Sequence, residues 1–130
     1  MKKWIGMLFI LLLLTACGQD SKENREAVYM NINAEEAKQI MDTTDGYIVL
    51  DVRTQEEYDQ GHIPGAMLIP HTDIETNAET MLTDKDQMIL VYCRSGRRSK
   101  MAAEALVALG YTNIREFGGI MDWPYEVVKP

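Results

Sequence analysis

Cysteine is scarce in this sequence, which has only two in 130 residues, Cys17 and Cys93. Cys17 follows an apolar N-terminal run, whereas Cys93 lies between a second apolar run and a group of arginines. Because the two contexts differ so much, we do not expect these cysteines to form a disulfide. The length is enough for one domain.

Long hydrophobic runs are also missing. The N-terminal run covers residues 4–14, whereas a membrane-spanning helix needs about 20 apolar residues. The run follows Lys2 and Lys3, and its length suits the apolar core of a secretory signal.

This N-terminal run ends in Leu14-Thr15-Ala16-Cys17, which resembles the bacterial lipoprotein signal motif. The resemblance implies a signal peptide over residues 1–16 and a lipid on Cys17. Residues 17–27 are then the lipidated cysteine and a flexible polar tether, and residues 28–130 form the folded domain. We therefore expect an extracytoplasmic protein that is lipid-anchored to a bacterial cell membrane. The alternative is an ordinary signal peptide with a chance cysteine.

Basic residues are few, since the sequence has 13 of them against 20 acidic residues, and the net charge is -7. A chain this acidic is a poor candidate for general nucleic-acid binding, so we expect no nucleic-acid partner. The three arginines that follow Cys93 are a local exception to the charge of the whole chain.

The chain is organised around these arginines and the segments that flank them. Residues 88–92 are apolar and predict a strand, and residues 99–109 predict a helix. The apolar stripe predicted for this helix consists of Met101, Ala102, Ala105, Leu106 and Leu109.

A tight loop between a strand and a helix directs its N–H groups and the helix N-terminus toward one point. Such a point binds anions without a metal. Cys93 opens this loop, and the local field favours its thiolate, which is the nucleophilic form. The arginines add positive charge that does not titrate away. The sequence therefore predicts cysteine chemistry on a small anion.

The rest of the chain alternates between strand and helix patterns. This alternation predicts a parallel sheet covered on both faces, with ligands beyond the carboxyl ends of the strands. The other predicted strands are 28–32, 47–50, 67–69 and 113–117. Capping boxes at Asn33 and Thr54 predict two helices, 34–41 and 54–60. Another helix begins at Thr72 or Asp73, with Ile74, Ala78, Met81 and Leu82 inward.

Four segments resemble signatures of the rhodanese family of sulfurtransferases. They are Leu50-Asp51-Val52-Arg53 with Glu57-Tyr58, the hexapeptide Gly61-His62-Ile63-Pro64-Gly65-Ala66, the loop Cys93-Arg94-Ser95-Gly96-Arg97-Arg98-Ser99, and Gly118-Gly119-Ile120-Met121-Asp122-Trp123. They occur in the family's order and at its spacing, and the resemblance covers essentially the whole folded part.

This resemblance implies an α/β fold with a five-stranded parallel sheet and helices on both faces. It implies that Cys93 takes a sulfane sulfur from thiosulfate or a related donor as a persulfide, which a thiol or cyanide then accepts. The loop residues implied to bind substrate are Arg94, Ser95, Gly96, Arg97, Arg98 and Ser99. No metal or organic cofactor is implied, and we expect a monomer.

Two other functions remain open from the sequence. A cysteine-dependent phosphatase or arsenate reductase has a related loop, but tyrosine phosphatases place five residues between cysteine and arginine. Here four residues separate Cys93 from Arg98. A non-catalytic rhodanese-fold binding or sulfur-carrier module is the second alternative, although binding modules commonly lose the cysteine.

Some polar residues near the signatures are predicted to be structural. We expect Arg53 to form an internal ion pair, with Glu57 as its suggested partner. His62 lies in a turn motif and is expected to be structural, because an ionised thiolate needs no general base. Trp123 is expected to pack in the core.

Overall fold

The computed structural model describes residues 28–130 of the chain. The predicted signal peptide, the lipid on Cys17 and the tether lie outside the described residues, so attachment to a membrane stays a prediction. Within residues 28–130, no helix is long and apolar enough to cross a bilayer.

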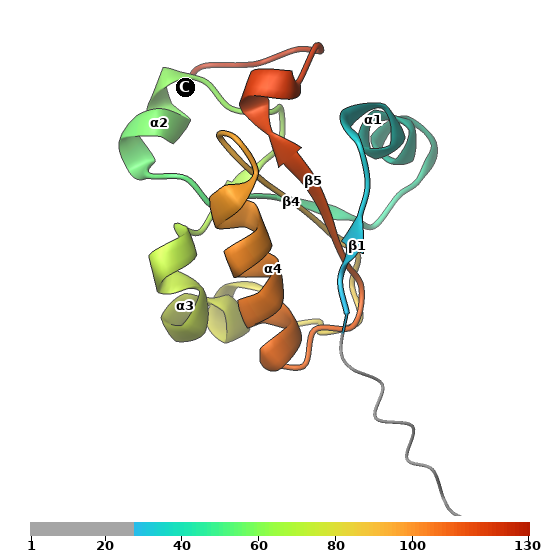
Figure 1. The fold of residues 1–130 in the computed structure, drawn as a ribbon, viewed down its shortest axis with the longest axis vertical. Helices are drawn as coiled ribbons and strands as arrows, with labels where there is room; N and C mark the ends of the chain where they lie inside the picture. The colour runs from blue at the N-terminus through green and yellow to red at the C-terminus, as the bar shows by residue number, and fades with distance from the viewer. Residues whose placement is uncertain (1–27) are drawn as a thin grey trace, which may run out of the picture.

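Five parallel strands form a single sheet in the order β1-β5-β4-β2-β3 (Figure 1). Their bounds are β1 Met30–Asn31, β2 Ile48–Asp51, β3 Met67–Leu68, β4 Ile89–Cys93 and β5 Ile114–Gly119. Every residue of the central strand β4 is buried, which accounts for its unbroken apolar run up to Cys93. The predicted sheet is therefore confirmed.

In the described part of the chain, four α-helices connect the strands, and both predicted capping boxes are present at Asn33 and Thr54. Each side chain accepts a hydrogen bond from the backbone three residues later, so these polar residues fix where α1 and α2 begin. The helices are α1 Ala34–Thr43, α2 Gln55–Gln60, α3 Ile74–Met81 and α4 Arg97–Ala108, with the 3₁₀ turns η1 His71–Asp73 and η2 Ile120–Asp122.

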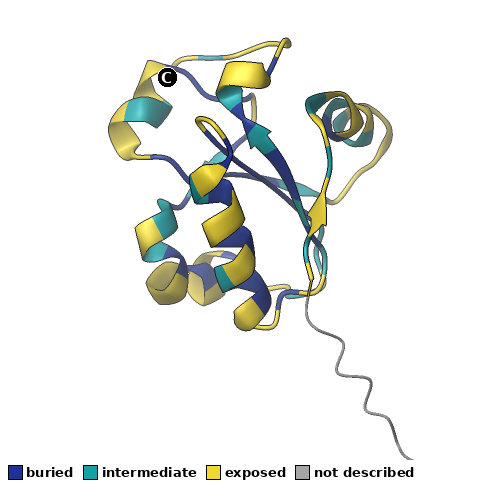
Figure 2. Cartoon of the chain, in the orientation of Figure 1, coloured by how far each residue is buried: buried dark blue, intermediate teal, exposed yellow. Residues whose placement is uncertain are grey.

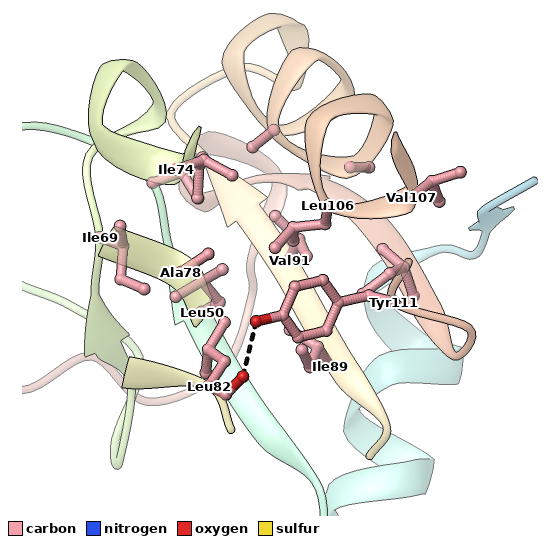
Figure 3. Close-up of a cluster of buried hydrophobic side chains, with 14 of the residues drawn as sticks. Leu50, Ile69, Ile74, Ala78, Leu82, Ile89, Val91, Leu106, Val107 and Tyr111 are labelled. Atoms are coloured by element: carbon pink, nitrogen blue, oxygen red, sulfur yellow. Dashed lines mark hydrogen bonds between the residues drawn. The ribbon is translucent and has the colours of Figure 1, made fainter. Parts of the chain in front are cut away.

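Helices cover both faces of the sheet, with α3 and α4 on one side and α1 on the other (Figure 1). Under α3 and α4, Tyr111 packs among aliphatic side chains and its hydroxyl donates to the Leu82 carbonyl at 2.6 Å (Figure 3). On the opposite face, Ala37 of α1 packs in a cluster with Phe117 and Trp123. Figure 2 shows that buried residues follow the strands and the inner sides of the helices.

Several sequence predictions need correction. Met81 and Met101 were placed on buried faces, but they are 43% and 50% exposed. Helix α4 begins at Arg97 rather than at Ser99, and its buried side includes Ala103 and Val107. The first strand is only Met30–Asn31. Methionine is flexible enough to be tolerated at the edge of an apolar stripe, so its position is a poor guide to which face of a helix is buried.

Candidate functional site

Cys93 lies at the carboxyl end of the central strand, where the chain turns into the loop before α4. It is the last residue of β4, and it is only 1% exposed. The loop is just three residues long, because α4 already begins at Arg97. This is the edge at which parallel α/β sheets bind ligands.

The sulfur of Cys93 accepts a backbone hydrogen bond. The Gly96 amide donates to Sγ at 3.0 Å. Gly96 has φ +107°, a left-handed backbone conformation that favours glycine. As the N-cap of α4, Gly96 offers no capping side chain, which leaves the first amides of the helix available to an anion.

The three arginines that follow Cys93 lie in different settings. Arg94 and Arg97 are exposed, whereas Arg98 is half-buried and forms a two-pronged ion pair with Glu57, at 2.6 and 2.9 Å. The hydrogen bond to Glu57 raises the pKa of Arg98. Binding of substrate by these arginines stays a prediction.

The ion pair also affects Glu57, because the hydrogen bond from Arg98 lowers the pKa of this carboxyl from 4.5 to about 2. The stabilisation is therefore present above pH 4.5 and is lost as the pH falls toward 2. Since both side chains are about a quarter exposed, solvent screening limits it to about 1 kcal/mol.

Glu57→Gln is expected to lower the free energy of unfolding by that amount at neutral pH. The difference from wild type should disappear near pH 2. Urea unfolding between pH 7 and pH 2 measures it, with Glu56→Gln as the control for loss of an exposed carboxylate on the same helix. A difference that persists undiminished at the lowest pH would contradict the assignment.

Arg53 pairs with Asp51 at 2.7 Å, so the predicted pairing with Glu57 is wrong. Arg53 also donates to the Gly61 carbonyl, and Asp51 accepts from the Tyr92 hydroxyl, both at 2.7 Å. Burial, with the nearby Asp51 carboxylate, raises the pKa of Tyr92 well above its ordinary range. This buried network joins the ends of β2 and β4 to the turn at Gly61, which is a structural role.

His62 also has a structural setting. Its ring stacks on Tyr58 with 3.7 Å between centroids, and its Nδ1 lies 3.0 Å from the Tyr58 carbonyl oxygen. These contacts agree with the structural role predicted for His62 and tie it to the end of α2.

Behind the loop lies a polar pair that the sequence patterns did not reveal as a unit. Ser99, predicted as part of the substrate cradle, is fully buried on the first turn of α4. Its Oγ is 3.4 Å from Sγ of Cys93 and 2.6 Å from Oε1 of Glu116 on β5. Glu116 was missed, although the single acid in this strand was the available signal.

The end of β5 is bulged where it passes the loop. Val91 pairs with Glu116, but Cys93 pairs with Gly119, so β5 contains one extra residue. Gly118 lies in this bulge with φ +88°. Beyond it, Gly119 lies against the peptide between Arg94 and Ser95.

A pocket of about 450 Å³ opens beside the loop. Arg94 belongs both to the loop and to the pocket wall, and Ile120, Met121 and Val127 line the C-terminal side. The Met121 amide donates to the Arg94 carbonyl at 3.1 Å and holds this wall to the loop. Among residues 28–130, no cluster of three His, Cys, Asp or Glu side chains is arranged to hold a metal ion.

Comparisons with known proteins agree with this geometry. The chain is 39% identical over 80 residues to thiosulfate sulfurtransferase PspE of Escherichia coli, which covers 62% of this chain and 77% of that protein. It is 37% identical over 107 residues to the putative sulfur carrier protein YrkF of Bacillus subtilis, covering 82% of this chain but only 56% of that protein.

Solved structures give the same result. A structure described as rhodanese with anions from E. coli is 37% identical and superposes with a TM-score of 0.61, over 65% of this chain and 99% of that one. A rhodanese-related protein from Thermoplasma volcanium is 32% identical with a TM-score of 0.68, over 78% of this chain and 100% of that one. The Rhodanese-like domain family matches residues 33–125, and the chain belongs to this family.

Proposed function

We propose that this protein is a sulfurtransferase that carries a sulfane sulfur on Cys93. The observation that carries the proposal is the setting of this thiol, which ends the central strand and accepts the Gly96 amide at 3.0 Å. A backbone donor on sulfur favours the thiolate over the thiol. Relatives named as sulfurtransferases support the same chemistry.

With thiosulfate as the donor, the Cys93 thiolate attacks the outer sulfur. A bond forms between Sγ and that sulfur, the sulfur–sulfonate bond breaks, and sulfite leaves with the electron pair. The persulfide keeps one negative charge, which the loop amides and nearby arginines stabilise. Cyanide or a thiolate then attacks the outer sulfur and returns Cys93 as thiolate, so the cycle is two-step covalent catalysis.

The contacts of Arg98 argue against the phosphatase alternative. A phosphatase needs an unpaired arginine in its loop, because the guanidinium group must donate hydrogen bonds to the substrate oxyanion. Here both terminal nitrogens of the Arg98 guanidinium already donate to the Glu57 carboxylate. The loop is also one residue shorter than that of tyrosine phosphatases. This geometry suits a single sulfur atom better than a tetrahedral oxyanion.

The sulfur-carrier alternative shares the persulfide but differs in its second step. One relative is named a putative sulfur carrier protein, which supports this alternative. The pocket beside Arg94 gives space for a small thiol acceptor next to the loop. We therefore assign small-molecule donors and acceptors to the protein, and steady turnover with cyanide distinguishes an enzyme from a carrier.

Mass spectrometry of the purified domain after incubation with thiosulfate tests the proposal. We expect the mass to increase by one sulfur atom, with fragmentation locating the sulfur on Cys93. Subsequent addition of cyanide should remove it and release thiocyanate. Protein whose thiol was first blocked with iodoacetamide is the control. Absence of the added sulfur in unblocked protein would overturn the assignment.

A further inference from the structure

Glu116 is a buried carboxyl group that the reaction described above does not use. It is only 2% exposed, and it lies in β5 between Arg115 and Phe117. Its Oε1 accepts from the Ser99 hydroxyl at 2.6 Å and from the Gly118 amide at 2.8 Å. A buried carboxyl held by two donors beside the reactive thiol needs a physical explanation.

The Ser99 hydroxyl connects this carboxyl to the thiol. It has one hydrogen to donate, and the acceptors around it are Glu116 Oε1 at 2.6 Å, the Gly96 carbonyl at 3.0 Å and the Gly118 carbonyl at 3.3 Å. The carboxylate is the closest and the strongest of these acceptors. With the hydrogen directed at Glu116, a lone pair of Oγ accepts from the Cys93 thiol at 3.4 Å.

We propose that Glu116 is a positioning residue that acts through Ser99 to accept the proton of Cys93. The Sγ–H bond breaks, and its hydrogen forms a new bond to Oγ of Ser99. The hydrogen that Ser99 already carried moves to Oε1 of Glu116. The products are a Cys93 thiolate, an intact Ser99 hydroxyl and a neutral Glu116. This inference rests on the proposed function, because it names how the nucleophile of that reaction is formed.

The transfer suits a site that is closed to solvent. Cys93 is 1% exposed, so direct release of its proton into water is obstructed. The relay moves one negative charge from oxygen to sulfur and leaves the charge of the cluster unchanged, which avoids the cost of creating a buried charge. Afterwards the Ser99 hydroxyl points at the thiolate and adds a second donor to the Gly96 amide.

Other charged groups also lie near Cys93 and Glu116. Helix α4 packs on this face of the sheet, and its Arg98 experiences the charge of Cys93. The phenol of Tyr29, just before β1, experiences both Glu116 and Glu104. The remaining charged residues of α4, Arg97 and Lys100, are exposed. Neither β1 nor β4 adds a carboxylate.

The pH dependence of Cys93 alkylation by iodoacetamide tests the relay without requiring sulfur transfer. Glu116→Gln keeps an oxygen that accepts from Ser99 and Gly118, but this amide cannot take up the proton. We expect the midpoint of the alkylation profile to rise by about one pH unit or more, which slows alkylation about tenfold at a pH below both midpoints. Ser99→Ala, which removes the bridge, should shift the midpoint in the same direction.

Glu104→Gln is the matched control, because it removes an exposed carboxylate that also acts on Tyr29 but does not contact Ser99. Its profile should match wild type. A purely electrostatic role for Glu116 predicts the opposite shift, since loss of a neighbouring negative charge favours the thiolate. An unchanged or lowered midpoint in Glu116→Gln or in Ser99→Ala overturns the relay. Persulfide formation detected by mass spectrometry would leave the proposed function standing in that case.

Discussion

Replacement of Cys93 by serine is expected to abolish sulfur transfer while leaving the protein folded. The change is nearly isosteric, and a serine oxygen can still accept the Gly96 amide that now donates to Sγ. A serine hydroxyl stays protonated at neutral pH and does not attack a sulfane sulfur. Loss of a nucleophile removes roughly four or more decades of rate in enzymes that depend on one.

The measurement is thiocyanate formation from thiosulfate and cyanide, with a circular-dichroism melt of each protein. Met101→Ala is the control for handling and expression, because Met101 is exposed on α4. The control should retain full activity. If Cys93→Ser still produced thiocyanate above the uncatalysed rate, the reaction would not proceed through a persulfide on this residue.

Gly119→Ala is expected to inactivate the protein through a backbone clash. A Cβ at this position would lie 1.9 Å from the Arg94 carbonyl oxygen and 2.5 Å from the Ser95 nitrogen. These are main-chain atoms of the active loop, so the loop must move away from β5. Overpacking of this kind costs about 1–3 kcal/mol, or more where nothing can yield. We expect a lower melting temperature and a loss of at least one decade of turnover in the molecules that remain folded.

Gly65→Ala provides a matched control that separates the clash from conformational strain. Gly65 has φ +79°, and nothing lies within 4 Å of its added Cβ, whereas Gly119 has an ordinary extended backbone. Gly65→Ala should lose about 1–2 kcal/mol of stability from its left-handed conformation. Its turnover per folded molecule should stay normal. Equal turnover in the two variants would show that Gly119 does not support the loop.

The main features of the fold were predictable because they rest on local patterns. The apolar run before Cys93 and the alternation of strands and helices imply the parallel sheet, and the two capping boxes mark helix starts through contacts only three residues apart. The position of Cys93 at a strand end follows from the same patterns. Each of these inferences needs only short-range geometry.

Pairings across the fold were harder to predict. Glu57, four residues along the chain, was the suggested partner of Arg53, but Glu57 instead meets Arg98, which is 41 residues away in the chain. Glu116 was missed for a similar reason, because its partner Ser99 lies on another element. Such partners depend on how the helices sit on the sheet, which a single sequence does not specify.

At Gly118, the bulge in β5 brings two requirements into conflict, because a regular strand would favour stability and the irregular one serves the active site. A regular strand would direct this amide into the sheet ladder, but the bulge turns it toward the Glu116 carboxylate at 2.8 Å. A redesign that straightened β5 by deleting Gly118 would produce a more ideal strand and would leave the buried carboxylate without its backbone donor. Stabilising changes chosen for regular geometry alone are therefore expected to fail at this position, in keeping with the general trade-off at active sites.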